Sequence, residues 1–263
     1  MGNPFFTIVV VSFNAAQTIR GTIDSVLAQR FQDYEIVVKD ACSSDSTLEQ
    51  IPEDPRIRIF CTKDGGIYHG MNEAVSYAKG TYIQFLNCGD RFHDDTVLQK
   101  IWEKAKDLPT PAVVYGDYCR SGVYYKQAGT VTPFYLYRTP LCHQTEFIHR
   151  ALFEKGGYDP KYSILADHDF ALRHFFSGVP FVYVPGSVCD YLGGGFSEAP
   201  KRIKQKYDES DALNRKYYSK KERFISELKI ALSMRKLRMA MTSDKSPLWV
   251  RKAYGAMLRI VNR

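Results

Sequence analysis

The sequence predicts an α/β protein with a Rossmann-like, mostly parallel sheet flanked by helices. Two observations carry this prediction. Short β-rich runs alternate with helical stretches between residues 6 and 118, and such connections join parallel strands through right-handed crossovers. A chain of 263 residues with 44% hydrophobic residues can also bury a large core. Ligands of such sheets bind at the carboxyl ends of the strands.

The expected elements follow from the period of the apolar residues. In the first half we predict strands at 6–11, 34–38, 56–60, 82–86 and 112–115. Between them we predict helices at 18–29 and 68–79 and one that opens at Asp95-Thr96, with Gly80 as the residue that ends the second helix. After Asp117 the pattern becomes mixed, with a hairpin within 118–132, helices near 151–155 and 166–177, and strands at 181–184 and 188–191. The last part reads as helices at about 199–218, 220–241 and 247–261.

Charge divides the chain into two regions. Residues 1–200 hold 18 basic and 23 acidic side chains, whereas residues 201–263 hold 18 basic and 6 acidic ones. We therefore expect a main domain over 1–198, with halves at 1–118 and 119–198, and a basic helical extension over 199–263. The mildly acidic main domain argues against nucleic acid as a partner. The basic extension binds an anionic partner or forms a solvated face.

The sequence lacks the motifs that are typical of several protein classes, so these classes are disfavoured. The first strand runs into Ser12–Ala16 without the glycines of a dinucleotide-binding turn, and the sequence has no phosphate-binding G-x-x-x-x-G-K-[ST] loop. The longest apolar run, 5–11, is far shorter than the roughly 20 residues of a membrane-spanning helix. The cysteines form no C-x-x-C pair, and no basic-then-apolar leader is present, so we expect a reduced, cytoplasmic protein without structural zinc.

Carboxylates follow several of the predicted strands. Asp90 ends the run Phe85–Gly89, Asp40 ends the second strand, and Asp64 precedes a Gly-Gly turn and Tyr68. Each has an ordinary interpretation as a turn or helix-capping residue. Each also stands where an α/β protein binds ligands, so Asp90 is either a turn residue or a metal ligand.

The order of these motifs resembles the inverting family 2 glycosyltransferases, which have the A-type fold of nucleotide-diphospho-sugar transferases. The resemblance spans about residues 6–178. It rests on 7–14, on 34–40 with Ser43-Ser44-Asp45-Ser46-Thr47, on 64–74, on 80–90, on His143-Gln144 with Phe147 and Arg150, on 156–159, and on Ala166-Asp167-His168-Asp169-Phe170. It implies that 1–118 binds a nucleotide-sugar donor and that 119–198 faces the acceptor.

The resemblance also implies residue roles. Asp40 would read the nucleotide base, Asp90 would hold Mn²⁺ or Mg²⁺ bridging the donor diphosphate, and Asp167 would take the proton from the acceptor hydroxyl. His143 would approach the diphosphate or the acceptor. The other expected donor-site residues are Phe13, Asn14, Asp64, Tyr68, Asn72, Asn87 and Asp169.

Two positions depart from the family pattern. Gly89 stands where the family usually has a carboxylate, so a metal would have the single, shifted carboxylate of Asp90. Ala166-Asp167 stands where many relatives have Glu-Asp, with Asp169 two residues on. We favour Asp167 as the base, and the alternative for Asp169 is a structural carboxylate paired with Arg173 at i+4.

The basic extension has a second pattern. Trp249, Ala253, Ala256, Met257 and Ile260 recur near helical spacing, which suits a helix lying on an anionic membrane or one packed on the catalytic domain. We predict a peripheral enzyme at the cytoplasmic face of the cell membrane, acting on a glycan or lipid-linked acceptor in bacterial surface polysaccharide synthesis. The alternatives are a sugar nucleotidyltransferase and a non-catalytic module that docks on membrane or nucleic acid.

Overall fold

The computed structural model describes residues 2–193, 199–233, 247 and 249–250. Its first half contains β1 (Phe6–Ser12), α1 (Ile19–Leu27), β2 (Tyr34–Asp40), η1 (Leu48–Gln50), β3 (Ile57–Cys61), α2 (Ile67–Tyr77), β4 (Tyr82–Phe85), β5 (Arg91–Phe92) and α3 (Val97–Ala105). The second half contains β6 (Val113–Arg120), β7 (Val123–Tyr125), α4 (Pro133–Arg138), η2 (His143–Thr145), β8 (Phe147–His149), η3 (Arg150–Lys155), α5 (Ala166–Phe176), β9 (Phe181–Tyr191), η5 (Pro200–Arg202), α6 (Ile203–Tyr217) and α7 (Lys220–Ser233).

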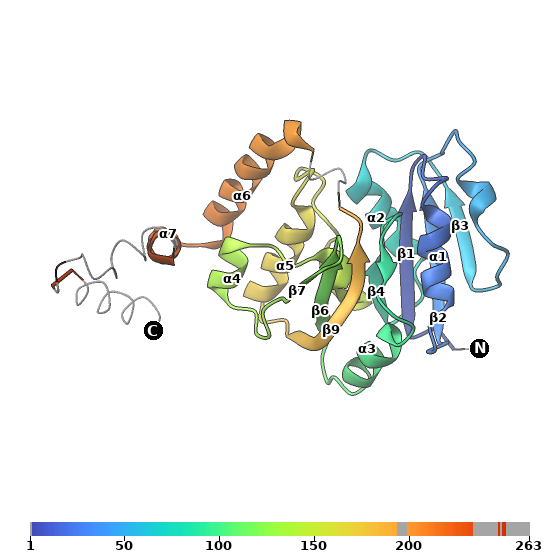
Figure 1. Ribbon diagram of the computed structural model, residues 1–263, viewed down its shortest axis with the longest axis horizontal. Helices are drawn as coiled ribbons and strands as arrows, with labels where there is room; N and C mark the ends of the chain where they lie inside the picture. Colours follow the sequence, from blue (N-terminus) through green and yellow to red (C-terminus); the bar gives the residue numbers. More distant parts are fainter. Residues whose placement is uncertain (1, 194–198, 234–246, 248, 251–263) are drawn as a thin grey trace. The chain divides into compact units, whose positions relative to one another are not determined.

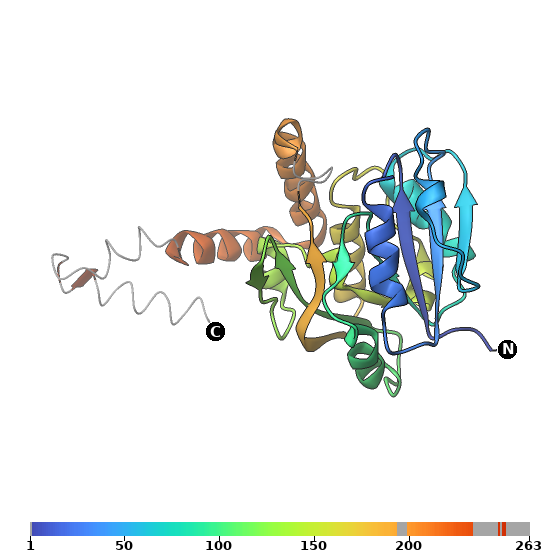
Figure 2. The same ribbon diagram turned by 45° about the vertical axis from the view of Figure 1, so that its right-hand side comes forward.

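The strands form one mixed sheet in the order β3-β2-β1-β4-β8-β6-β9-β5, with β7 paired to β6 (Figures 1 and 2). The first four strands are parallel, as predicted. Strand β8 then enters antiparallel between β4 and β6, and β5 pairs antiparallel with β9. The predicted α/β class and flanked sheet are confirmed, and the carboxyl ends of β1, β2 and β4 lie at one edge.

Helices cover both faces of the parallel strands. Phe6, Ile8 and Val10 of β1 share a buried cluster with residues of α1 and α3, whereas α2 packs on β1 and β2 with Met71 outside that cluster. Strands enclosed on both faces bury successive residues, which explains the almost unbroken apolar run of β1.

Gly80 has a different role from the one predicted. Helix α2 ends earlier, with Ala78 as its C-terminal cap. A Cβ atom on Gly80 would lie 2.4 Å from the backbone nitrogen of Thr7. The close approach of this loop to β1 therefore requires a residue without a side chain.

The remaining predicted elements are found with changed bounds. The hairpin is β6–β7, the helix near 151–155 is the 3-10 helix η3, and the two strands expected within 181–191 are the single strand β9. Strands β5 and β8 and helix α4 were not predicted from the sequence. Of the predicted helix at 247–261, the structure describes only residues 247, 249 and 250, and the predicted apolar positions Ala253, Ala256, Met257 and Ile260 lie outside the described residues.

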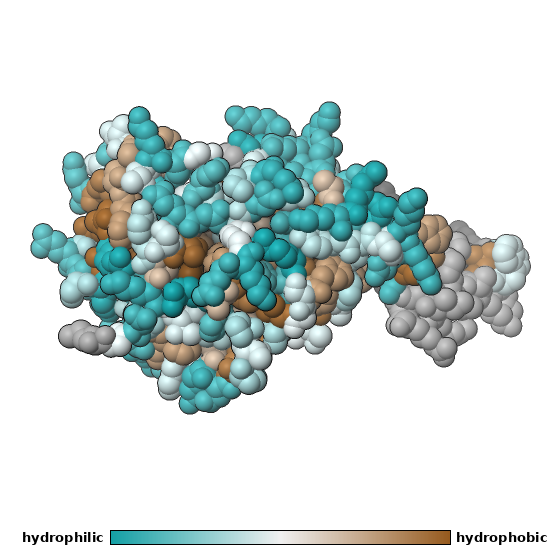
Figure 3. Space-filling view, turned by 180° about the vertical axis from the view of Figure 1, so that it is seen from behind, coloured by the Kyte–Doolittle hydropathy of each residue, from teal (hydrophilic) through white to brown (hydrophobic). Residues whose placement is uncertain are grey.

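The chain divides into two compact units, residues 1–131 with 141–209, and residues 132–140 with 210–263. In the second unit the hydroxyl of Tyr218 donates to the Pro133 carbonyl at 2.9 Å, and Tyr137 bonds Glu227 at 2.6 Å. The domain boundary at 198/199 stays a prediction. Seen from behind, hydrophilic side chains cover much of the visible surface, with smaller hydrophobic areas between them (Figure 3). Among the described residues, no helix combines the length and the apolar character that crossing a membrane requires.

Candidate active site

Asp167 lies in the first turn of α5, where the helix dipole favours a negative charge. Its Oδ1 accepts hydrogen bonds from the Tyr68 hydroxyl at 2.9 Å and from the His168 backbone N–H at 2.8 Å. Its Oδ2 lies 3.2 Å from Nδ1 of His143. Burial alone would raise the pKa of Asp167, but the hydrogen bonds and the charge of His143 hold it below its ordinary value. The carboxylate is therefore ionised and fixed in orientation.

His143 connects Asp167 to the end of strand β4. Its Nε2 lies 3.1 Å from the amide nitrogen of Asn87. Burial would lower the pKa of His143, but the hydrogen bond and charge of Asp167 raise it to about 9. A protonated imidazole donates from both nitrogens, and the Asn87 Oδ1 is buried without a hydrogen-bond partner. Rotating the Asn87 amide by half a turn lets its Oδ1 accept a hydrogen bond from Nε2 of His143, so that both of these atoms have a partner.

Glu146 is a buried acid of this cluster that the sequence analysis missed. Burial and the charge of Asp167 together raise the pKa of Glu146 to about 8, so its protonated form predominates at neutral pH. The buried carboxyl of Glu146 and the partly exposed carboxyl of Asp167 are therefore driven to opposite protonation states. The available signal was an acid directly before Phe147, in a segment that becomes the interior strand β8.

Asp90 is almost fully buried at the turn that follows β4. Its Oδ2 accepts from the Gln144 side chain at 3.1 Å, and its Oδ1 accepts from the Leu192 backbone N–H at 2.9 Å. The carboxylate thus joins the turn to η2 and to the segment after β9. Within the described residues, Asp90 belongs to no group of three His, Cys, Asp or Glu side chains that converge on one point.

The ends of β1 and β2 form a second group. Asp40 is buried, and its carboxylate accepts from the Ser12 hydroxyl at 2.7 Å and from the Ser43 backbone and hydroxyl at 2.7 and 2.6 Å. Burial would raise the pKa of Asp40, but these hydrogen bonds lower it. Asn14, at a positive φ of 49°, accepts from the Ser44 N–H at 2.9 Å. Beside it, the Phe13 ring is 64% exposed.

Lys39 is a buried cation beside this group, and the sequence analysis missed it too. Its Nζ donates to the Thr62 carbonyl at 2.7 Å and lies 3.5 Å from Asp64 and 3.4 Å from Glu73. It therefore ties the end of β2 to the loop that carries Asp64 and to α2. The available signal was a charged residue between the apolar run 36–38 and Asp40.

Two other predicted residues make structural contacts. The Asn72 side chain exchanges two hydrogen bonds of 2.8 Å with the backbone of Tyr158, one in each direction. Asp169 is buried, whereas the Asp167 side chain keeps 13% exposure. Nη2 of Arg173, the expected partner of Asp169, donates to the carbonyls of Gly156 and Gly157 at 2.7 and 2.8 Å.

The structure thus joins four predicted residues, Tyr68, Asn87, His143 and Asp167, in one chain of contacts. These come from α2, the turn after β4, η2 and α5. Asn14 and Asp40 belong to the second group, at the ends of β1 and β2, through Ser43 and Ser44. Their direct roles toward a ligand stay predictions.

The chain is similar to known proteins over most of its length. Residues 7–160 match the family model described as glycosyl transferase family 2. A PGL/p-HBAD biosynthesis glycosyltransferase of Mycobacterium bovis (strain BCG / Pasteur 1173P2) is 30% identical over 184 residues, which cover 66% of this chain and 71% of the relative. Chondroitin synthase of Pasteurella multocida (strain Pm70) is 38% identical over 116 residues, 43% of this chain and 12% of the relative.

Solved structures share the fold. The S. aureus TarS 1-349 structure in complex with UDP-GlcNAc has a TM-score of 0.64 at 16% identity and covers 99% of this chain and 80% of that one. The mannosyltransferase PcManGT from Pyrobaculum calidifontis, in complex with GDP-Man and Mn²⁺, has a TM-score of 0.57 at 17% identity, covering 99% and 75%.

Proposed function

The chain belongs to glycosyl transferase family 2, and we propose that it is an inverting enzyme that moves a sugar from a nucleotide diphosphate to a hydroxyl of a glycan or lipid-linked acceptor. The resemblance drawn from the motifs is confirmed, and the fold is the A-type glycosyltransferase fold. Curated relatives act in glycan synthesis. Family membership favours this function over a nucleotidyltransferase or a non-catalytic module.

The contact chain Tyr68–Asp167–His143–Asn87 is the observation that carries the proposed mechanism. Asp167 takes the proton of the acceptor hydroxyl as that oxygen attacks the anomeric carbon from the face opposite the leaving nucleotide. The bond to the diphosphate oxygen breaks with its electron pair, so the configuration inverts. Tyr68 and His143 keep Asp167 ionised and aligned, which suits a base in a largely buried site.

His143 brings positive charge to this site. With its pKa raised to about 9, it is protonated at neutral pH and lies between Asp167 and the turn that carries Asn87. We propose that this charge also faces the departing diphosphate. A fixed cation that opposes charge formed in the transition state lowers the barrier in a site from which water is partly excluded.

The residues at this site fit a divalent cation, Mn²⁺ or Mg²⁺, only when the donor diphosphate supplies further ligands to it. The turn after β4 supplies the carboxylate of Asp90, whose oxygens accept from the Gln144 side chain and from the Leu192 backbone N–H. Such cations are commonly held by one or two carboxylates together with substrate phosphates. When bound, the cation would offset charge on the nucleoside diphosphate, and Asp90 would hold it.

We place the nucleotide at the second group of residues. The exposed Phe13 ring offers a face for stacking a base, and Asp40 is the base-reading residue. The Ser12 and Ser43 hydroxyls can rotate to other acceptors, which leaves an Asp40 oxygen able to accept from a base imide N–H. Asp64 and Asn72 support the adjoining loop and helix.

The test of this function is a panel of UDP-, GDP- and dTDP-sugars, measured for binding by calorimetry and for hydrolysis or transfer by release of the nucleoside diphosphate. We expect one base to be preferred, and we expect Phe13→Ala to weaken the binding of all the nucleotide-sugars because a stacking ring accepts any base. Absence of binding to every nucleotide-sugar by the folded protein would contradict the proposal.

We also propose peripheral attachment to the cytoplasmic face of a membrane through the basic extension. The charge of residues 201–263 and the 72% exposure of Trp249 support this proposal.

A further inference from the structure

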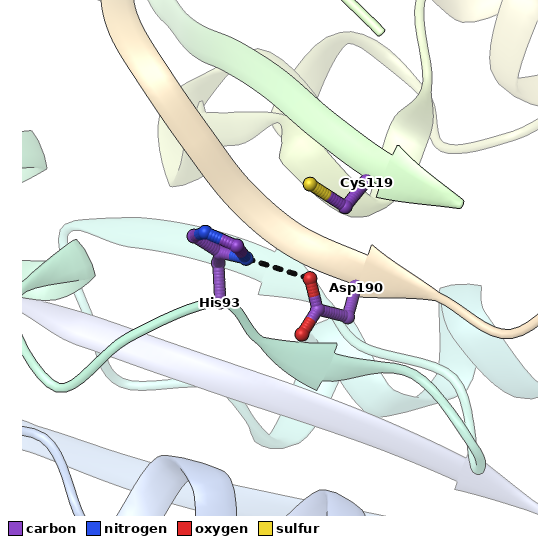
Figure 4. A group of neighbouring side chains, drawn as sticks. All are labelled: His93, Cys119 and Asp190. Carbon is purple, nitrogen blue, oxygen red and sulfur yellow. Dashed lines mark hydrogen bonds and ion pairs between the residues drawn. The ribbon is translucent and has the colours of Figure 1, made fainter. Parts of the chain in front are cut away.

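Three side chains with different metal-binding atoms converge on one face of the sheet (Figure 4). His93 follows β5, Cys119 lies on β6 and Asp190 lies on β9. One ligand atom from each lies within 4.8 Å of the other two, and Nδ1 of His93 is 2.7 Å from Oδ1 of Asp190. We call these residues the 93–119–190 cluster.

The strand register explains this convergence. Cys119 is the direct partner of Asp190 across the β6–β9 ladder, so the two side chains stand on the same face. Arg91 is the partner of Asp190 on the other side, and His93, two residues later, bonds the Val188 carbonyl through its N–H at 3.0 Å. The two-residue period of a strand returns His93 to the face of Asp190.

The cluster is partly open to solvent. Cys189, next to Asp190, is fully buried, whereas the side chains of His93 and Asp190 are 40% and 53% exposed. An incoming ion can reach the cluster from solvent, and exposed side chains can shift by the tenths of an ångström that coordination requires.

The donor set indicates the class of ion. An imidazole nitrogen, a thiolate and a carboxylate suit Zn²⁺, which accepts nitrogen, sulfur and oxygen ligands in tetrahedral geometry. Hard cations such as Mg²⁺ and Ca²⁺ prefer sites made of oxygen atoms alone. The present His93–Asp190 contact holds the imidazole with Nδ1 beside the carboxylate, and an ion between them would replace the proton that they share.

We propose that His93, Cys119 and Asp190 bind Zn²⁺ with three protein ligands and one position open to water. No structural zinc was expected from the sequence, because its cysteines form no C-x-x-C pair; the fold instead brings together single residues from three separate segments. The ion would link β5, β6 and β9. Because Leu192, two residues after Asp190, donates to Asp90, it would also stiffen the segment that holds Asp90.

The test uses the full-length, reduced and metal-free protein titrated with Co²⁺ alone, followed by Zn²⁺. We expect about one equivalent of Co²⁺ to give a thiolate-to-cobalt charge-transfer band that Zn²⁺ abolishes. Cys119→Ser should remove the band, and Asp190→Asn should weaken Co²⁺ binding about tenfold or more. Zn²⁺ should raise the melting temperature of the wild type but not of Cys119→Ser.

The control is Cys61→Ser, because the thiol of Cys61 lies 3.6 Å from that of Cys42 and offers another thiol pair. This variant should keep the band in full. A band that disappears in Cys61→Ser and persists in Cys119→Ser would overturn the proposal, as would a folded wild type that gives no thiolate band. Circular dichroism of each variant separates loss of the site from loss of the fold.

Discussion

Nδ1 of His143 lies 3.2 Å from Oδ2 of Asp167, and this contact joins the segment before β8 to the first turn of α5. His143 stabilises the negative charge of Asp167, and Asp167 stabilises the positive charge of His143. The pKa of His143 rises to about 9, and that of Asp167 falls below its ordinary value although burial would raise it. The proposed base is therefore one half of an ion pair, and its reactivity depends on its partner.

Asp167→Asn should leave donor binding nearly intact and lower kcat by a factor of roughly 10² to 10⁴, the usual effect of removing a general base. The amide keeps the size of the side chain and can still accept from Tyr68. Steady-state kinetics and calorimetry with the donor measure the two effects. Asp169→Asn is the matched comparison, because an active Asp167→Asn beside an inactive Asp169→Asn would reverse the roles of the two acids.

Asp90→Ala should weaken nucleotide-sugar binding much more in Mn²⁺ than in EDTA, because the carboxylate is proposed to act through the cation. Calorimetry of the wild type and the variant in both conditions gives the four affinities. Mn²⁺ should bind the free wild type weakly and bind firmly once UDP is present.

Gln144→Met is the control for this prediction, since it removes a hydrogen bond to Asp90 and keeps the carboxylate. It should preserve the difference between Mn²⁺ and EDTA. If Asp90→Ala weakens binding equally in both conditions, Asp90 is a turn residue that holds Gln144 and Leu192.

The unfolding free energy should fall from about pH 4.5 to about pH 8 because of Glu146, and from about pH 6.5 to about pH 9 because of His143. Both groups have pKa values raised by folding, so the folded state binds their protons more tightly than the unfolded chain. Their contribution is complete below the unfolded pKa values and is lost as pH rises through the folded ones. Urea unfolding at several pH values measures this slope.

Glu146→Gln should flatten part of that pH dependence, since glutamine keeps the shape and removes the titrating proton. Glu49→Gln, a change of the same kind at an exposed position, should leave the slope as it is in the wild type. Identical slopes in all three proteins would show that Glu146 does not titrate in this range.

The full-length protein should sediment with vesicles that contain anionic lipid, and a chain truncated after Ser243 should not. Each basic residue near such a surface contributes about 1 kcal/mol of attraction, so high salt should release the protein. Trp249→Ala tests the apolar contribution with the charge unchanged. The truncated enzyme should still transfer sugar to a water-soluble acceptor analogue. Membrane attachment would be refuted if truncation unfolded the protein, or if the wild-type protein did not bind the vesicles.

The sequence predicted the parallel half of the sheet well because its signals are local. β1, β2 and β4 are enclosed on both faces, so they appear as apolar runs, and α1 and α2 show the helical period between them. The carboxylates Asp40 and Asp90 follow the strands directly. Their positions at one edge of the sheet followed from the parallel topology alone.

Short or irregular elements could not be read in this way. β5 has two residues and β8 has three, which is too few for a period to appear. The register shifts between β6 and β9, near Asp117, and Gly186 has a positive φ of 112°. This irregularity made one strand look like two in the sequence.

The sequence by itself determined which residues stand at strand ends and which family the motifs resemble, because those properties depend on neighbours along the chain. Only the tertiary structure decided which side chains meet. The His143–Asp167 ion pair, the buried Lys39 beside Asp64, and the convergence of His93, Cys119 and Asp190 join residues far apart in sequence. The pKa shifts of His143 and Asp167 depend on burial and on the contact between them, and both arise only when these distant segments meet in the folded chain.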